Sequence, residues 1–211
     1  QRASERALRG GTNLTRVLEM VRAFRQQNTS TPVVLMGYLN PFEIAGYEAF
    51  AKSATDAGVD GVLTVDLPPE EADEFLAAVR ANGLDLIFLL APTSDEARIR
   101  RICDTASGFV YYVSLKGVTG ASNLDIASVA EKVNEIKRFT DLPVGVGFGI
   151  SDGKTAAEVA AVSDAVVVGS ALVRTVESLS DRPQDIPQAV AEVLAEMRRA
   201  MDARAETAAA G

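Results

Sequence analysis

The sequence contains no histidine, and Cys103 is its single cysteine among 211 residues. Without histidine, neither a Ser-His-Asp triad nor a Cys-His pair can form, and the commonest metal ligand is missing too. A single cysteine excludes a disulfide framework and a cysteine-based zinc site, and it favours a reducing, cytoplasmic compartment. Any chemistry is therefore left to carboxylates, hydroxyls, lysines and backbone amides, and we expect no metal site.

The sequence also lacks long apolar runs and an excess of positive charge. No stretch approaches the roughly 18 apolar residues of a membrane span, and the first residues lack the pattern of a signal peptide. Lys and Arg number 21 against 29 Asp and Glu, which gives a net charge of −8 and disfavours nucleic acid or anionic membranes as partners. The length and 47% hydrophobic content fit one domain, residues 1–211, with its own core.

Apolar runs and helical patterns alternate along the chain. We expect a polar helix that ends at Gly10-Gly11, a second helix capped by Thr12, and a long helix from Asn40, as its cap, to Gly58 with Ile44 facing inward. The first strand is expected to be covered on both faces. About six strands, each followed by a helix, predict an α/β fold with a parallel sheet. The predicted strands are 33–36, 61–65, 86–90, 109–113, 143–146 and 165–168; a last helix is predicted at 186–201 and a frayed tail at 206–211.

Three glycine-rich loops follow predicted strands: residues 116–120, 145–151 and 169–171. In parallel α/β folds, ligands bind at the carboxyl ends of the strands, where these loops lie. Glycine allows the backbone to approach a ligand closely, and Ser170 opens a helix whose amino end favours negative charge. The three loops together predict a phosphate site, although any one of them alone is also explained as a tight turn.

Several other polar residues allow two interpretations. Asp66 follows the strand 61–65 on the ligand-binding side, so it is either catalytic or holds its loop through backbone amides. Asp60, Asp85 and Asp164 precede strands and are interpreted as structural. Cys103 is interpreted as a small buried apolar group.

The motifs at residues 35–41, 61–68, 111–120, 147–150 and 169–171, taken in this order, resemble the tryptophan synthase α subunit. The resemblance extends from Gln1 to about Glu177 and is weaker in the last helix. It implies a TIM (β/α)8 barrel, here with about six βα units. The implied enzyme is a lyase that cleaves indole-3-glycerol phosphate by a retro-aldol reaction into indole and glyceraldehyde 3-phosphate. It needs no cofactor of its own and assembles as αββα with a β subunit that carries pyridoxal phosphate and receives the indole through a tunnel.

The resemblance also implies roles for particular residues. Tyr111 lies beside the substrate as an auxiliary catalytic residue, and Thr119 anchors a mobile loop around residues 117–120. The other roles follow as a set: Gly120, Gly149, Gly169 and Ser170 hold the phosphate, Tyr38 and Phe148 line the indole pocket, and Asn40 and Pro68 contact the β subunit.

The chain departs from the family at its beginning. The family's general acid/base Glu and an Asp that polarises the indole nitrogen correspond to positions before Gln1. Six strands instead of eight, a start inside a helix and a first residue other than Met lead us to expect a chain without the first quarter of the protein. We therefore expect an unpaired sheet flank, self-association, and no retro-aldol activity of the chain alone. The alternatives are another phosphate-sugar TIM-barrel enzyme, such as an isomerase, an epimerase or indole-glycerol-phosphate synthase, and a non-catalytic docking subunit.

Overall fold

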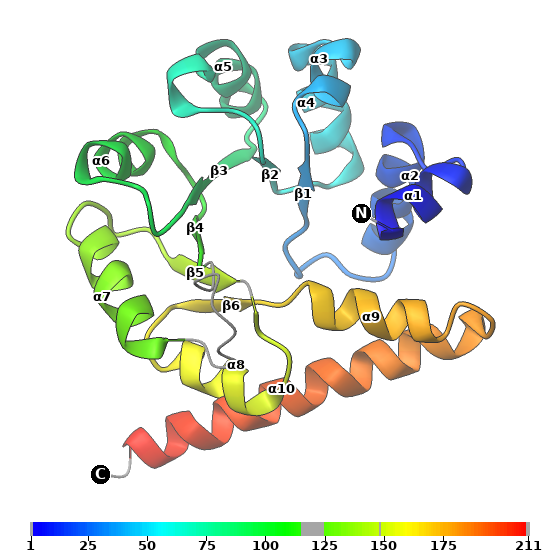
Figure 1. Ribbon diagram of the computed structural model, residues 1–211. Helices are drawn as coiled ribbons and strands as arrows, with labels where there is room; N and C mark the ends of the chain where they lie inside the picture. Colours follow the sequence, from blue (N-terminus) through cyan, green and yellow to red (C-terminus); the bar gives the residue numbers. More distant parts are fainter. Residues whose placement is uncertain (1, 115–124, 148, 210–211) are drawn as a thin grey trace. The chain divides into compact units, whose positions relative to one another are not determined.

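The computed structural model describes residues 2–114, 125–147 and 149–209. Helices and strands alternate through these residues (Figure 1). Each predicted strand is present, displaced by no more than one residue at either end. The strands are β1 Val34–Gly37, β2 Gly61–Thr64, β3 Asp85–Leu90, β4 Val110–Val113, β5 Val144–Gly147 and β6 Ala165–Val167.

Helices precede the first strand and follow every strand. Two short 3₁₀ turns, η1 Pro69–Glu71 and η2 Pro183–Asp185, add to them. The predicted tail at 206–211 overlaps the last turn of the final helix. The helices are α1 Arg2–Arg9, α2 Leu14–Arg25, α3 Asn40–Ala45, α4 Tyr47–Ala57, α5 Asp73–Ala81, α6 Glu96–Thr105, α7 Ile126–Lys137, α8 Gly153–Ala160, α9 Ser170–Ser178 and α10 Ile186–Ala209.

The chain forms two compact units, one of Gln1–Leu89 with Arg101–Val110 and one of Leu90–Arg100 with Tyr111–Gly211. In the first unit, β1, β2 and β3 lie in chain order and pair in parallel. In the second unit, β4, β5 and β6 also follow chain order, and β5 pairs with β6 in parallel. Parallel neighbours joined through helices confirm the predicted α/β class.

A cluster of aromatic rings forms part of the first unit's core and corrects the prediction of one long helix. The helix is broken at Gly46, whose φ of +81° only glycine adopts readily, so that α3 and α4 present different faces to the sheet. Phe42 and Phe50 are therefore buried, with ring centroids 4.2 Å apart, whereas Ile44 is 79% exposed. The prediction that Ile44 faces the core was wrong because the spacing was counted through the break.

The amino ends of two other elements also differ from the sequence-based expectation. Asn13, not Thr12, caps α2, since its side chain accepts the backbone N–H of Arg16. Asn40 is the first residue inside α3 and not its cap. Leu35 of β1 is buried, but its neighbours Val34 and Met36 are 37% and 62% exposed, so β1 is covered on one face and not on both.

The second unit packs α7, α8 and α10 around the pair β5–β6. Val133 of α7, Val146 of β5, Val159 of α8 and Met197 of α10 are all buried. The contacts of α10 are made mainly with α8 and α9. This packing fixes the place where β5 and β6 end, which is where two of the glycine-rich loops begin.

Two of the three aspartates interpreted as structural, Asp60 and Asp164, hold the starts of strands, whereas Asp85 is the first residue of β3. Asp60 Oδ2 accepts the Val33 N–H at 2.7 Å and pairs with Arg25 at 2.5 Å. Asp164 Oδ2 accepts the Val144 N–H at 2.7 Å and pairs with Lys137 at 2.5 Å. In both cases, a carboxylate joins the start of the preceding strand to a basic residue at the end of the helix before it. We call each three-residue arrangement a strand-start latch.

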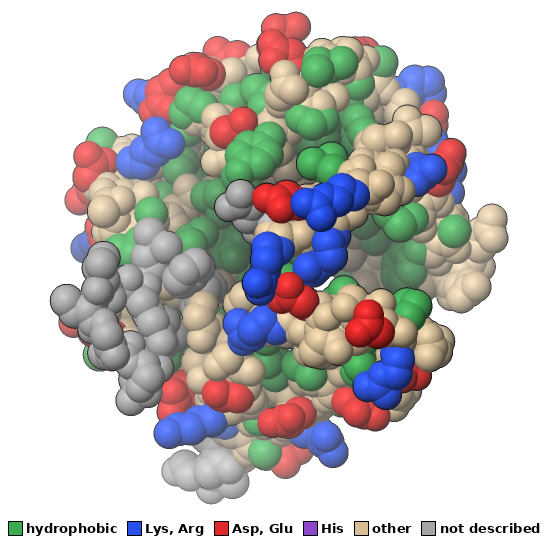
Figure 2. Space-filling model, turned by 45° about the vertical axis from the view of Figure 1, so that its right-hand side comes forward, with side chains coloured by type: hydrophobic (Ala, Val, Ile, Leu, Met, Phe, Trp, Pro, Cys, Tyr) green, Lys and Arg blue, Asp and Glu red, His purple; other side chains and the backbone are tan. Residues whose placement is uncertain are grey.

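The remaining sequence-based expectations concern burial and charge. Cys103 is buried and free, and burial raises the pKa of its thiol to about 11, so it behaves as an apolar group. Acidic and basic side chains lie interspersed on the face drawn in Figure 2. Within the described ranges, every helix is too short or too polar to span a lipid bilayer.

Candidate functional site

In the first unit, the residues after β1 and β2 are joined by Asp66. Its Oδ1 accepts the backbone N–H of Leu39 at 2.8 Å, and the Val65 N–H donates to the Gly37 carbonyl at 3.0 Å. Of the two interpretations of Asp66, the loop-holding one is therefore confirmed. The contact sets the loop after β1 against the loop after β2 at the carboxyl ends of these strands.

Tyr38 and Pro68 lie in the two loops that Asp66 connects, and Asn40 lies at the start of α3, which follows the first of these loops. Tyr38 directly follows β1 and is 67% exposed, so its ring is available to a ligand or a partner. Asn40 is exposed at the start of α3, and Pro68 is half-buried just before η1. All three residues follow the carboxyl ends of β1 and β2, and their roles in indole binding and partner contact stay predictions.

In the second unit, Tyr111 of β4 packs against Gly147 at the end of β5. A Cβ atom at Gly147 would lie 2.7 Å from Tyr111 Cε2 and 2.8 Å from Tyr111 Cζ, so a side chain does not fit there. The tyrosine ring is by itself enough to make glycine necessary at Gly147. The ring is half-buried, and this burial raises the pKa of the Tyr111 hydroxyl, which is neutral at pH 7.

The loops after β5 and β6 are aligned by the register of these strands. Gly147 of β5 is paired with Val167 of β6. Gly149 follows Gly147 by two residues, and Gly169 follows Val167 by two residues. Gly149 has a φ of +76°, which favours glycine. The register therefore shows that the loops carrying these two glycines begin at one level, at the carboxyl ends of the strands.

The amino end of α9 is open at Gly169 and Ser170. Gly169 precedes the helix without a side-chain cap, and among the described residues a Cβ placed on it would meet no heavy atom within 4 Å beyond its chain neighbours. The first N–H groups of a helix have no acceptor within the helix, and the dipole there favours an anion. The prediction that Ser170 opens a helix is confirmed, and the arrangement has the chemistry of a small anion site.

The aspartates in the loops after strands are engaged with backbone groups. Asp95 Oδ1 accepts the Arg98 N–H at 2.8 Å, and Asp125 Oδ1 accepts the Ser128 N–H at 3.2 Å. Asp152 caps α8 by accepting the N–H and the hydroxyl of Thr155, and these hydrogen bonds lower the pKa of its carboxyl group. Together with Asp66, each of these described aspartates holds a loop or a helix end.

Sequence analysis overlooked one polar residue at this end of the second unit. Ser114, which follows β4, is buried, and its hydroxyl donates to the Gly147 carbonyl at 3.0 Å. The only indication in the sequence is a hydroxyl directly after the apolar strand and directly before a glycine-rich loop. Thr119, Gly120 and Phe148 lie outside the described residues, so their roles and the mobility of the loop 117–120 remain predictions.

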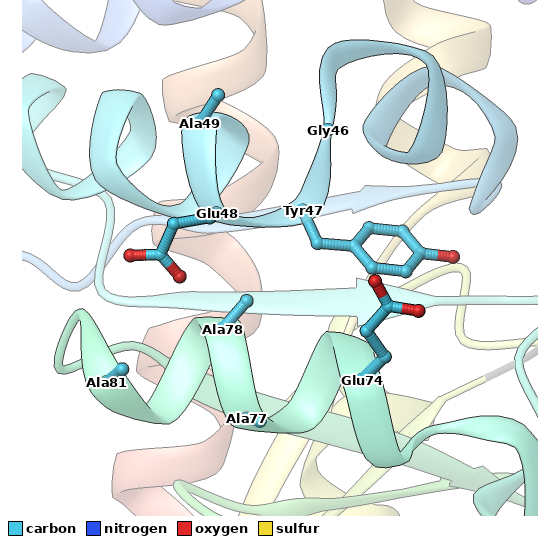
Figure 3. A pocket seen from close by; sticks show the side chains of 8 residues that line it. All are labelled: Gly46, Tyr47, Glu48, Ala49, Glu74, Ala77, Ala78 and Ala81. Carbon is cyan, nitrogen blue, oxygen red and sulfur yellow. The ribbon is translucent and has the colours of Figure 1, made fainter.

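A pocket of about 640 Å³ lies elsewhere, on the helix side of the first unit between α4 and α5 (Figure 3). Alanines and the carboxylates of Glu48 and Glu74 line it, and Glu74 and Tyr47 point toward one another. Burial and the charges of Glu43 and Glu74 raise the pKa of Tyr47. Carboxylates repel an anion, so this pocket is not the predicted phosphate site. In the described part of the chain, no three metal-binding side chains of His, Cys, Asp or Glu cluster.

Comparison with known sequences identifies relatives over nearly the whole chain. The family model for the tryptophan synthase alpha chain matches residues 1–203. A tryptophan synthase alpha chain from Thioalkalivibrio sulfidiphilus is 62% identical over 202 residues, which cover 96% of this chain and 76% of the relative. One from Nitrosococcus oceani is 56% identical and is covered to 75% of its length.

Solved structures that match the fold of this chain are also named as tryptophan synthase. Tryptophan synthase subunit alpha from Legionella pneumophila str. Paris has a TM-score of 0.86 and 42% sequence identity, with 96% of this chain and 74% of that chain covered. A structure of the tryptophan synthase α2β2 complex from Pyrococcus furiosus has a TM-score of 0.83 and 36% identity, with 93% and 78% covered. These matches confirm the TIM-barrel class and do not favour another phosphate-sugar enzyme. The chain belongs to the tryptophan synthase alpha chain family, whose members are lyases of tryptophan biosynthesis.

Proposed function

We propose that this chain binds indole-3-glycerol phosphate for retro-aldol cleavage into indole and glyceraldehyde 3-phosphate. The observation that carries the proposal is that the loops after β5 and β6 begin at one level, and that the second of them ends at the open amino end of α9, at Gly169 and Ser170. Backbone N–H groups there hold the phosphate, and Gly120 closes over it. Tyr38 and Phe148 contact the indole ring, while Tyr111 lies beside the substrate and Thr119 anchors the neighbouring loop.

The cleavage needs proton transfer at the indole ring and at a glycerol hydroxyl, and each positioned acid or base contributes on the order of 10²–10⁴-fold. The described aspartates at the carboxyl ends of the strands already accept backbone N–H groups. A carboxylate that holds a backbone amide is poorly placed to take a proton from a substrate. The 211-residue polypeptide therefore binds the phosphate end of the substrate but releases no indole by itself.

The partner that this proposal assigns is a tryptophan synthase β subunit in an αββα assembly. Its support is the likeness to the α chain of the Pyrococcus furiosus α2β2 complex. Asn40 and Pro68 form the contact, and both are at least partly accessible. Pyridoxal phosphate belongs to the β subunit, and this chain requires no cofactor of its own. The free, buried Cys103 favours a reducing compartment, so we assign the protein to the cytoplasm.

Titration of the 211-residue chain with glyceraldehyde 3-phosphate and with inorganic phosphate tests the anion site. Gly169→Ala adds a methyl group where the structure leaves open space, so the fold tolerates it while the phosphate loses its place. We expect at least tenfold weaker binding and an unchanged melting temperature. Ser178→Ala, at the other end of α9, is the matched control and retains full affinity. Equal affinity of the Gly169→Ala variant and the parent chain contradicts the site.

Indole release from indole-3-glycerol phosphate tests the reaction. The 211-residue chain is assayed alone and with a β subunit, next to a complete relative such as the Thioalkalivibrio sulfidiphilus protein as positive control. We expect no release without the relative. Release by the short chain that is lost on Asp66→Asn would show that Asp66 is catalytic after all. Stimulation of the β subunit by a chain that binds no phosphate would instead favour a docking subunit.

A further inference from the structure

Ser114 is 3% exposed and directs two donors to one acceptor. Its backbone N–H and its hydroxyl each lie 3.0 Å from the carbonyl oxygen of Gly147. The N–H bond joins the end of β4 to the end of β5. The hydroxyl of Ser114 makes a second bond to the same carbonyl, which pairing of the two strands does not require.

A carbonyl oxygen has two lone pairs, and two donors restrict the orientation of its peptide plane more than one does. The Gly147 carbonyl belongs to the peptide group through which the chain leaves β5. Holding that carbonyl in place restricts the orientation of the peptide group from which the loop after β5 starts. Ser114 therefore acts on the geometry of the loop after β5 from the neighbouring strand.

Tyr111 restricts Gly147 from the same strand. Its ring contacts Gly147 so closely that no Cβ fits, while Ser114 holds the carbonyl of the same residue. Gly147 is thus fixed both at its Cα and at its carbonyl. A binding site made of backbone N–H groups needs this precision, because its donors have no side-chain torsions with which to adjust and must be correct to within about 0.5 Å.

We propose that Ser114 is a positioning residue of the phosphate site: its hydroxyl orients the Gly147 carbonyl, and with it the peptide group from which the loop carrying Gly149 starts. This inference rests on the proposed function. Ser114 does not touch the ligand itself. Its effect appears as lost affinity for phosphate and not as lost stability, because the Gly147 carbonyl retains the Ser114 N–H as a partner when the hydroxyl is removed.

The test uses the 211-residue chain with Ser114→Ala and Ser114→Thr. The first removes the donor, and the second restores a hydroxyl. Ser114→Cys adds a variant of similar shape with a weaker donor, in case either of the others fails to fold. The matched control is Ser107→Ala, because the Ser107 hydroxyl also bonds a backbone group, the Leu86 N–H at 3.0 Å, at the opposite end of the strands.

The affinity for inorganic phosphate and glyceraldehyde 3-phosphate is measured by calorimetry, and the amide resonance of Gly149 by NMR. We expect Ser114→Ala and Ser114→Cys to weaken phosphate binding at least fivefold and to shift the Gly149 resonance, with Ser114→Thr within twofold of the parent. Ser107→Ala lowers the melting temperature but leaves affinity and the Gly149 resonance unchanged. If the parent binds phosphate and Ser114→Ala and Ser114→Cys bind it equally well, the positioning role is refuted. If the parent binds no phosphate, the proposed function itself fails.

Discussion

Thr64 at the end of β2 offers a prediction in which a mutation stabilises the protein. The residue is 3% exposed, and its Oγ1 has no hydrogen-bond partner in the part of the chain that the structure describes. A buried hydroxyl without a partner costs about 1–3 kcal/mol relative to its hydration in the unfolded chain. Valine has nearly the same shape and the same branching at Cβ, so Thr64→Val leaves packing and rotamer preference unchanged.

We therefore expect Thr64→Val to raise the free energy of unfolding by about 1–2 kcal/mol. For a chain of this length, each kcal/mol corresponds to roughly 2–4 °C in melting temperature. Because the sequence contains no tryptophan, unfolding in urea is followed by circular dichroism at the helix band.

Thr55→Val is the matched control in the same unit. The Thr55 hydroxyl donates to the Asn82 carbonyl at 2.8 Å, so the identical change removes a hydrogen bond and lowers stability by about 0.5–1.5 kcal/mol. Opposite signs for the two variants support the reasoning. Destabilisation by Thr64→Val as large as that by Thr55→Val would falsify it and would show that the Thr64 hydroxyl is bonded, for example to a buried water.

Two further predictions concern the strand-start latches. Gly58 and Gly83 have φ values of +92° and +72°, so alanine at either costs about 1–2 kcal/mol of backbone strain. A Cβ at Gly58 would also lie 2.6 Å from Arg25 Cγ, whereas a Cβ at Gly83 meets no described atom within 4 Å. Gly58→Ala should therefore lower the free energy of unfolding in urea more than Gly83→Ala does. Equal losses in the two variants would contradict the contact with Arg25. Burial of Asp164 opposes its charged form, but hydrogen bonds from Lys137 and Val144 and the Lys137 charge lower the carboxyl pKa below 3.8. The contribution of Asp164 to stability is thus present above pH 3.8 and is lost as the pH falls through the lower pKa that this group has in the folded state. The free energy of unfolding of Asp164→Asn should therefore fall less steeply with pH in this acidic range than that of the parent chain. Identical pH dependence of the two proteins would refute the role of Asp164.

The strands were predictable because each lies in a short apolar run near polar, glycine or proline residues, and this pattern is visible in the local sequence. The break at Gly46 could not be predicted, because a glycine within a helical pattern is compatible with one helix or with two. The packing of Phe42 against Phe50, which requires two helices, is not visible in the sequence. The burial of β1 was predicted wrongly for a related reason. Apolar residues indicate that burial is possible, but the neighbours that supply it lie outside the local sequence.

For the candidate site, the sequence identified loops more reliably than contacts. Glycine-rich segments after Gly147 and before Ser170 are visible in the sequence, and the register of β5 and β6 confirms that the two begin at one level. The hydrogen bond from Ser114 to Gly147 joins residues 33 positions apart, and no local pattern indicates such a pair. The choice between the two roles of Asp66 also depended on a distant group, the Leu39 N–H.

The strand-start latches have a consequence for how this chain can change. Each latch uses the end of one helix, the start of the following strand and the residue before the next strand, so it ties successive βα units together at the amino ends of the strands. The amino ends of the strands lie opposite the ends from which the glycine-rich loops extend. Neither of these two latches constrains the loops at the carboxyl ends of the strands, so those loops can vary in sequence, while the three residues of a latch have to change together.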